Sequence, residues 1–154
     1  MMVSKVRGSF RTFSGSLVTA PNPLESSVSA SIELSSVDTR NEDRDNHLRS
    51  ADFFSVETSP KMTFHSTGIR QDGDRLIATG ALTIKDATLP VELGLEFLGV
   101  ENDPYGNTRV GFEATTQISR KEWGITTNVP LDGDKVMIGD KVDIVLAIQA
   151  VHQD

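Results

Sequence analysis

The stretch "RVGFEATTQI" (residues 109–118) alternates apolar and polar side chains along most of its length. Val110, Phe112, Ala114 and Ile118 share one face, and charged or hydroxyl-bearing residues occupy most positions between them. Successive side chains of a β-strand point to opposite faces of the sheet. This period of two therefore predicts a strand that has one face on a core and the other in water.

The same alternation recurs along the chain, at residues 28–34, 91–97 and 142–148. Turn-forming Asp, Asn and Gly residues separate such runs in "QDGD" (71–74), "ENDPYGN" (101–107) and "LDGD" (131–134), and these predict hairpin connections. The predicted strands are residues 5–18, 26–37, 60–70, 75–85, 90–102, 107–119 and 141–151. We expect an antiparallel meander.

One short helix is predicted at residues 42–48, with Asn41 or Thr39 as its N-cap and acidic residues in its first turn. A further turn is predicted from Ser119 to Trp123. The fold class is therefore all-β, with about seven strands in a single domain over residues 1–154. A long meander usually closes on itself to remove its edges, which predicts an antiparallel barrel.

Composition excludes several classes of function. The 154 residues include no cysteine, so disulfides and thiolate sites are absent, and the net charge of −7 argues against nucleic-acid binding. No apolar run approaches the roughly 20 residues of a membrane-spanning helix, and residues 1–10 contain no apolar stretch of signal-peptide type. These features predict a cytoplasmic protein without stable membrane insertion.

Catalytic motifs are weak. His47 follows Asp43 and Asp45 closely, so a general base oriented by a carboxylate is one interpretation, but no nucleophile or second histidine lies nearby in sequence. His47 otherwise serves as a polar group near a cavity mouth or as a hydrogen-bond partner of the turn. There is no nucleophile elbow, phosphate loop or metal-ligand spacing. We expect no catalytic residue, no metal and no cofactor.

Arg40, Arg44 and Arg49 crowd the helical segment. Their guanidinium groups are suited to a diphosphate or another polar head group. The favoured interpretation is internal pairing with neighbouring carboxylates, because acidic residues are at least as numerous here. These carboxylates belong to Glu42, Asp43, Asp45 and Asp52.

Six segments in order resemble the YceI-like family of lipocalin-like, polyisoprenoid-binding proteins. They cover the chain from Val6 to about Ala150. The matching stretches are "VRGSFRTFSG" (6–15), "SVDTRNEDRDNHLRSADFF" (36–54), "PKMTFHSTGI" (60–69), "GALTIKDATLPVEL" (80–93), "ISRKEWGI" (118–125) and "GDKVDI" (139–144).

This resemblance implies an extended antiparallel barrel of about eight strands around a long apolar cavity for an isoprenoid chain, and often a homodimer. The family pattern has an additional opening strand, and the present chain begins close to where that strand would end. We therefore expect either a late start or a barrel that lacks one strand. In the second case another chain, or a rearranged N-terminus, would cover the gap.

The predicted function is binding, carriage or sequestration of an amphiphilic isoprenoid lipid, of polyprenyl phosphate or isoprenoid quinone type, without chemistry. Two alternatives stay open: an enzyme that acts on an isoprenoid or fatty amide through His47 and Asp45, and a structural barrel with a filled interior. The predicted ligand-binding residues are His47 and the large apolar residues Phe10, Phe13, Leu34, Leu48, Phe53, Phe54, Phe64, Leu82, Ile84, Leu93, Leu95, Phe97, Phe112 and Trp123.

Overall fold

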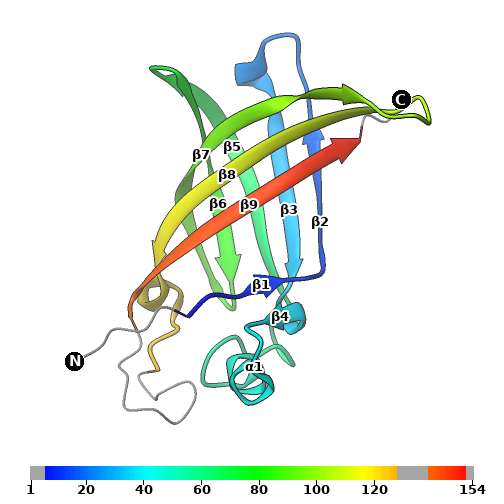
Figure 1. Ribbon diagram of the computed structural model, residues 1–154. Coiled ribbons are helices and arrows are strands. Elements are labelled where there is room, and N and C mark those ends of the chain that lie inside the picture. Colours follow the sequence, from blue (N-terminus) through cyan, green and yellow to red (C-terminus); the bar gives the residue numbers. More distant parts are fainter. Residues whose placement is uncertain (1–5, 128–138, 152–154) are drawn as a thin grey trace.

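A seven-stranded antiparallel sheet dominates the protein. The structure is a computed structural model that describes residues 6–127 and 139–151. The strands follow the order β2-β3-β5-β6-β7-β8-β9, so each pairs with its neighbour along the meander, and the sheet curls into a barrel (Figure 1). Their bounds are β2 Phe13–Val18, β3 Ser27–Glu33, β5 Lys61–Asp72, β6 Arg75–Ile84, β7 Ala87–Asn102, β8 Thr108–Ser119 and β9 Lys141–Val151.

The remaining elements are short and lie mainly at one end of the barrel, here called the base (Figure 1). Strand β1 (Ser9–Phe10) pairs with β4 (Val37–Asp38) in a separate two-stranded sheet. Helix α1 spans Glu42–Arg49, and Asn41 caps it by accepting a hydrogen bond from the Arg44 N–H. The single-turn helices are η1 (Pro23–Glu25), η2 (Leu34–Ser36) and η3 (Arg120–Trp123).

Sequence periodicity predicted most of this architecture correctly. The helix and the turn before Trp123 lie where they were expected, and the predicted hairpins join β5 to β6 and β7 to β8. The turn predicted at residues 131–134 lies outside the described residues.

Two predicted strands are wrong in extent. The described part of the strand predicted at residues 5–18 is interrupted at Arg11 and Thr12, which hydrogen-bond to Ser36 through their backbone N–H groups. This bend lets β1 cross the base, where it pairs with β4 instead of continuing along β3. The strand predicted at 26–37 ends at Glu33, because the chain turns through η2 before β4 begins.

The sheet curls without closing. Among the described residues, β2 and β9 are the two ends of the strand order and are not paired with one another. The prediction of about seven strands is confirmed, and the barrel keeps two edges that carry unpaired backbone donors and acceptors.

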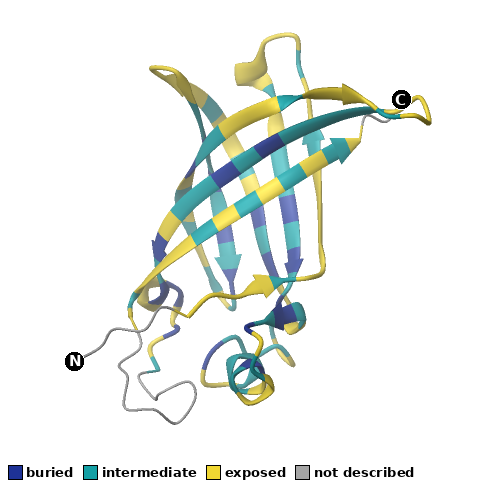
Figure 2. Ribbon diagram, in the orientation of Figure 1, coloured by how far each residue is buried: buried dark blue, intermediate teal, exposed yellow. Residues whose placement is uncertain are grey.

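Burial is graded along the barrel axis. Buried residues gather toward the base, whereas the end that carries the hairpins, here called the upper end, is largely exposed (Figure 2). Gly80 allows close packing in the lower half, since a Cβ at this position would lie 2.6 Å from Cζ of the buried Phe64. The aromatic ring thus lies directly against the β6 backbone.

Candidate functional site: the inner face of the barrel

The inner face of the sheet is the face that carries the core, and strand pairing shows which residues belong to it. Phe112 is buried and lies directly opposite Phe97 on β7 and Ile148 on β9. Residues opposite one another in adjacent strands share a face. Phe97 therefore faces inward, and yet it is 63% exposed.

This exposed apolar surface continues toward the upper end. Val100 pairs with Val110, which pairs with Ala150, and all three lie on the same face as Phe112. Val100 is 56% exposed. Side chains of the described residues thus do not fill the upper part of the barrel interior, and its wall there is apolar.

The base, in contrast, is closed by a group of apolar side chains that we call the base plug: Phe10, Leu34, Phe53, Phe54 and Trp123. Leu34, Phe53 and Trp123 are buried, and the rings of Phe10 and Phe54 meet edge to face at 5.8 Å. The indole Nε1 of Trp123 donates to the Leu82 carbonyl at 2.9 Å, which satisfies its one polar group.

The predicted site residues fall into two groups. Phe13, Phe64, Leu82, Ile84, Leu93, Leu95, Phe97 and Phe112 lie on strands of the main sheet and share its inner face. Phe10, Leu34, His47, Leu48, Phe53, Phe54 and Trp123 lie at the base, outside those strands. Only the first group surrounds the barrel interior, and lining of a ligand by either group stays a prediction.

Several inner-face residues are missing from the predicted set, namely Leu17, Leu76, Val91, Val100, Val110, Ile144, Leu146 and Ile148. The alternating pattern along each strand could have identified most of them, because every second residue shares the face of Phe112.

A depression of about 320 Å3 lies on the opposite face of the sheet, over β2, β3 and β5. Its lining includes Ser14, Ser16, Ser29 and Ser31, which alternate with inward-facing residues. The depression is open to solvent on the outside of the barrel, so it does not enclose a ligand.

His47 belongs to the base. Its Nε2 lies 2.9 Å from Oδ2 of Asp52, and its ring meets the buried ring of Phe53 edge on at 5.0 Å. Asp45, the other half of the enzymatic interpretation, instead accepts hydrogen bonds from the backbone N–H and hydroxyl of Thr39. The two residues therefore do not form a catalytic pair.

We predict that His47→Ala leaves the affinity for an apolar probe within about twofold of the wild-type value, because His47 contacts the turn after α1 and not the upper interior. The unfolding free energy should fall by about 1 kcal/mol through loss of the Asp52 hydrogen bond. Probe titration and urea unfolding measure the two quantities. A large loss of probe binding without a loss of stability would contradict this role.

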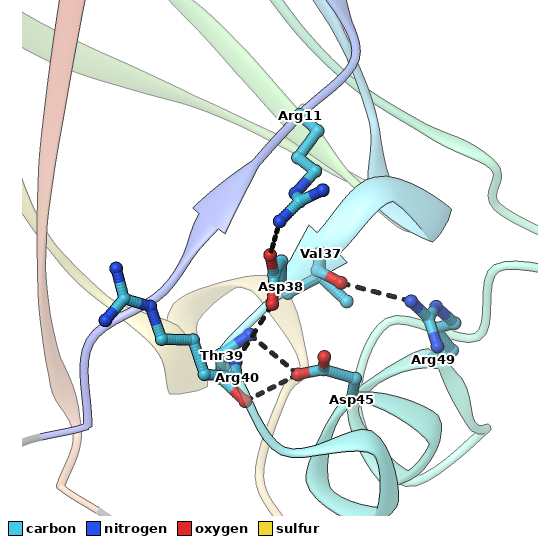
Figure 3. A network of polar contacts seen from close by, with 7 residues as sticks. All are labelled: Arg11, Val37, Asp38, Thr39, Arg40, Asp45 and Arg49. Carbon is cyan, nitrogen blue, oxygen red and sulfur yellow. Dashed lines mark hydrogen bonds and ion pairs between the residues drawn. The ribbon is translucent and has the colours of Figure 1, made fainter.

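Polar contacts tie α1 to the strands at the base (Figure 3). The Asp38 carboxylate is paired with Arg11 and also accepts from the Arg40 N–H at 2.9 Å. The Arg49 guanidinium donates to the carbonyls of Ser35 at 2.9 Å and Val37 at 3.1 Å.

The side chains of the three arginines in this segment, Arg40, Arg44 and Arg49, differ in their contacts. Arg44 and Arg49 engage in internal hydrogen bonds as expected, but they bind backbone carbonyls, the Thr39 hydroxyl and the Asn46 amide oxygen. For Arg49, two backbone carbonyls and the Asn46 amide oxygen stand in place of the expected carboxylates. The exposed Arg40 side chain points away from the network (Figure 3).

Three carboxylates have a pKa below the ordinary value of 3.8. The Arg40 N–H, and after it the Arg11 guanidinium, lowers the pKa of Asp38. The Asn107 N–H has the largest effect on the pKa of Asp103, and the Ser119 hydroxyl has the largest effect on the pKa of Asp140. Each carboxylate joins two segments at a turn or strand end.

Acid should therefore destabilise the protein. A carboxyl group with a lowered folded pKa contributes stability that is complete above its unfolded pKa and is lost as the pH falls through the folded value. We expect the urea midpoint to fall as the pH drops below about 4. Asp140→Asn should flatten this dependence, because it removes one of the three carboxyl groups with a lowered pKa. A midpoint that is constant from neutral to strongly acidic pH would contradict this expectation.

Residues 1–150 match the YceI-like domain. This chain belongs to the YceI-like family. The lipocalin-like barrel implied by the sequence resemblance is thereby confirmed. Its curated relatives include a UPF0312 protein of Pectobacterium atrosepticum and Protein YceI of Escherichia coli O157:H7, two names that state no enzymatic activity.

The first of these relatives is 39% identical over 148 residues, which are 95% of this chain and 73% of the relative. The second is 38% identical over 147 residues, which are 95% and 74% of the two chains. The crystal structure of a Campylobacter jejuni YceI protein has a TM-score of 0.83 and 27% identity, covering 100% of this chain and 89% of that one.

Burkholderia cenocepacia BcnA has the same fold, with a TM-score of 0.79 and 23% identity over 93% of this chain and 86% of its own. Within the described part of the YceI-like chain, no cluster of His, Asp and Glu is arranged to hold a metal ion. None of the helices in residues 6–127 and 139–151 is long and apolar enough to cross a membrane. The cytoplasmic location stays a prediction.

Proposed function

We propose that the protein binds a long isoprenoid lipid, of polyprenyl phosphate or isoprenoid quinone type, along the inner face of its barrel. It carries or sequesters this lipid without changing it chemically. The observation that carries the proposal is the exposure of Phe97 and Val100 on the face that is otherwise the core. An apolar wall in contact with water is stabilised by an apolar ligand.

The shape of the site suits a chain with one polar end. The base plug blocks the lower end with buried aromatic and aliphatic side chains, so a tail would be enclosed there. A polar head group would lie at the open upper end, in contact with water. Ligand and barrel would then share one axis.

Burial of apolar carbon is sufficient to give useful affinity. One isoprenoid unit contributes roughly 4 kcal/mol at ~0.8 kcal/mol per buried carbon group, before the cost of ordering the chain. Two or three buried units would reach a Kd in the micromolar range or below. Binding needs no charged group, so the selectivity would come from length and width of the tail.

The absence of chemistry is part of the proposal. The polar side chains nearest to a catalytic arrangement, His47 and Asp45, have separate partners in Asp52 and Thr39. Both contacts lie at the base and hold turns together. They give neither residue a substrate-facing role on the inner face.

A displacement titration tests the proposal. The fluorescent probe N-phenyl-1-naphthylamine is titrated into purified protein, and an isoprenoid alcohol is then added. We expect saturable probe uptake and its displacement by the alcohol. Absence of uptake by protein from which lipid has been extracted, with the fold verified by circular dichroism, would contradict the proposal and favour a filled structural barrel.

We also propose that the protein is a homodimer. The edges of β2 and β9 carry backbone groups without a partner strand in the described structure, and such edges favour association between chains. Sedimentation velocity measures the state directly. A monomer at micromolar concentration would contradict the proposal.

A further inference from the structure

The connections at the upper end of the barrel are here called the rim. It consists of the β2–β3 connection with η1, the β5–β6 and β7–β8 hairpin turns, and the C-terminal end of β9 (Figure 1). An antiparallel meander places these segments at one end, opposite α1 and the base plug. The exposed part of the inner face ends at this rim.

Exposed residues concentrate toward the rim (Figure 2), and large apolar side chains are among them. Among the described residues they are Val18, Leu24, Phe97, Leu98, Val100, Tyr105 and Val151, whereas Val6, Phe13, Val142 and Val145 are the ones elsewhere. Single exposed apolar residues are normal, but a concentration at one end marks an interaction surface. Tyr105 is 88% exposed at the tip of the β7–β8 hairpin.

Two of the rim residues, Tyr105 and Leu24, are held in ordered turns. Oδ1 of Asp103 accepts from the N–H groups of Tyr105 and Asn107, both at 2.9 Å. On the other connection, the Asn22 side chain accepts from the Leu24 N–H at 3.1 Å. Contact through preformed turns costs little conformational entropy.

The charge of the rim restricts its partner. Within residues 18–27, 70–76, 96–109 and 148–151 there are six acidic residues, Glu25, Asp72, Asp74, Glu96, Glu101 and Asp103, against three basic ones, Arg70, Arg75 and Arg109. Anionic lipids attract basic segments. This acidic, apolar rim is suited to a surface without net charge.

We propose that the rim docks on a zwitterionic lipid bilayer, so that the isoprenoid chain passes between bilayer and barrel without crossing water. The inference rests on the proposed function, because the rim surrounds the open end of the inner face. Tyrosine at the tip fits the interface, where an amphipathic ring has one end in apolar surroundings and the other in water. The contact is peripheral and reversible.

Single-cysteine labelling tests the docking, since the natural chain has no cysteine. Tyr105→Cys and Leu24→Cys are labelled with an environment-sensitive nitrobenzoxadiazole fluorophore and mixed with phosphatidylcholine vesicles. Val145→Cys, which is exposed on the outer face of β9, is the matched control. We expect a blue-shifted, brighter emission from the two rim labels and no change from the control.

A second variant measures how much the Tyr105 side chain contributes to vesicle binding. Tyr105→Ser should lower the partition of the full-length protein onto phosphatidylcholine vesicles by about tenfold, since one buried aromatic side chain contributes roughly that factor. Replacing part of the lipid with phosphatidylglycerol should not strengthen binding. Unchanged emission from the rim labels, unchanged partition of Tyr105→Ser, or binding that requires the anionic lipid would overturn the proposal.

The two proposals fail separately. Tyr105→Ser should retain N-phenyl-1-naphthylamine as well as the wild-type protein does, because Tyr105 lies in the hairpin loop, outside the strands that form the inner face. If the wild-type protein does not take up the probe, the lipid-binding function is overturned, and the docking surface is not. The vesicle measurements show whether the rim docks on a bilayer, whatever the result of the probe titration.

Discussion

Aspartate in place of Phe97 should weaken binding of N-phenyl-1-naphthylamine by tenfold or more, the largest loss expected of any single exposed residue. The substitution removes an aromatic surface from the apolar wall and puts a carboxylate next to the ligand, and together these effects exceed ~1.4 kcal/mol. Stability should change little, because the side chain is 63% exposed in the folded protein. Probe titration gives the affinity, and thermal unfolding gives the stability.

Val145→Asp is the matched control. Val145 is 60% exposed, but its partner on β8 is Thr115, so its side chain lies on the outer face of the sheet. The account predicts wild-type probe affinity for this variant. Equal losses in the two variants would show that added charge, and not the inner face, determines probe binding.

Trp123→Ala should lower the unfolding free energy by about 3–5 kcal/mol, the range for removal of a large buried side chain. Trp123 is 3% exposed and belongs to the base plug. The substitution also leaves the Leu82 carbonyl without the indole N–H that it accepts at 2.9 Å. In a domain of this size the melting temperature should fall by roughly 10 °C.

Trp123→Phe separates packing from hydrogen bonding. It keeps most of the apolar volume and removes the donor, so we expect a smaller loss, about 1–3 kcal/mol. Tyr105→Ala, at an exposed aromatic residue, should stay within about 0.5 kcal/mol of the wild-type value. If Trp123→Ala were as stable as the wild-type protein, the base would not be a packed plug.

The barrel was predictable because the relevant signal is local. Alternation along residues 109–118 depends only on which side of a strand each residue occupies, and the turn residues at 71–74 and 101–107 mark where strands reverse. The break after Phe10 was not predictable in this way. It depends on hydrogen bonds between Arg11, Thr12 and Ser36, which are distant in sequence.

The predicted site residues were a mixture of base-plug residues and inner-face residues. Phe53 and Phe97 are the same residue type, but Phe53 is 3% exposed in the base plug and Phe97 is 63% exposed on the inner face. Sequence alone does not reveal at which end of the barrel a side chain lies. The partners of Arg49 were missed for a related reason. The carbonyls of η2 and β4 come within reach of its guanidinium only because the chain turns at η2.

Native mass spectrometry of gently purified protein, followed by organic extraction, tests the central claim most directly. The account predicts a species heavier than the apo-protein by the mass of one long-chain lipid, released on extraction and identified as an isoprenoid. Apo-protein alone, with no isoprenoid in the extract and no uptake of an added isoprenoid alcohol, would contradict a barrel that holds lipid.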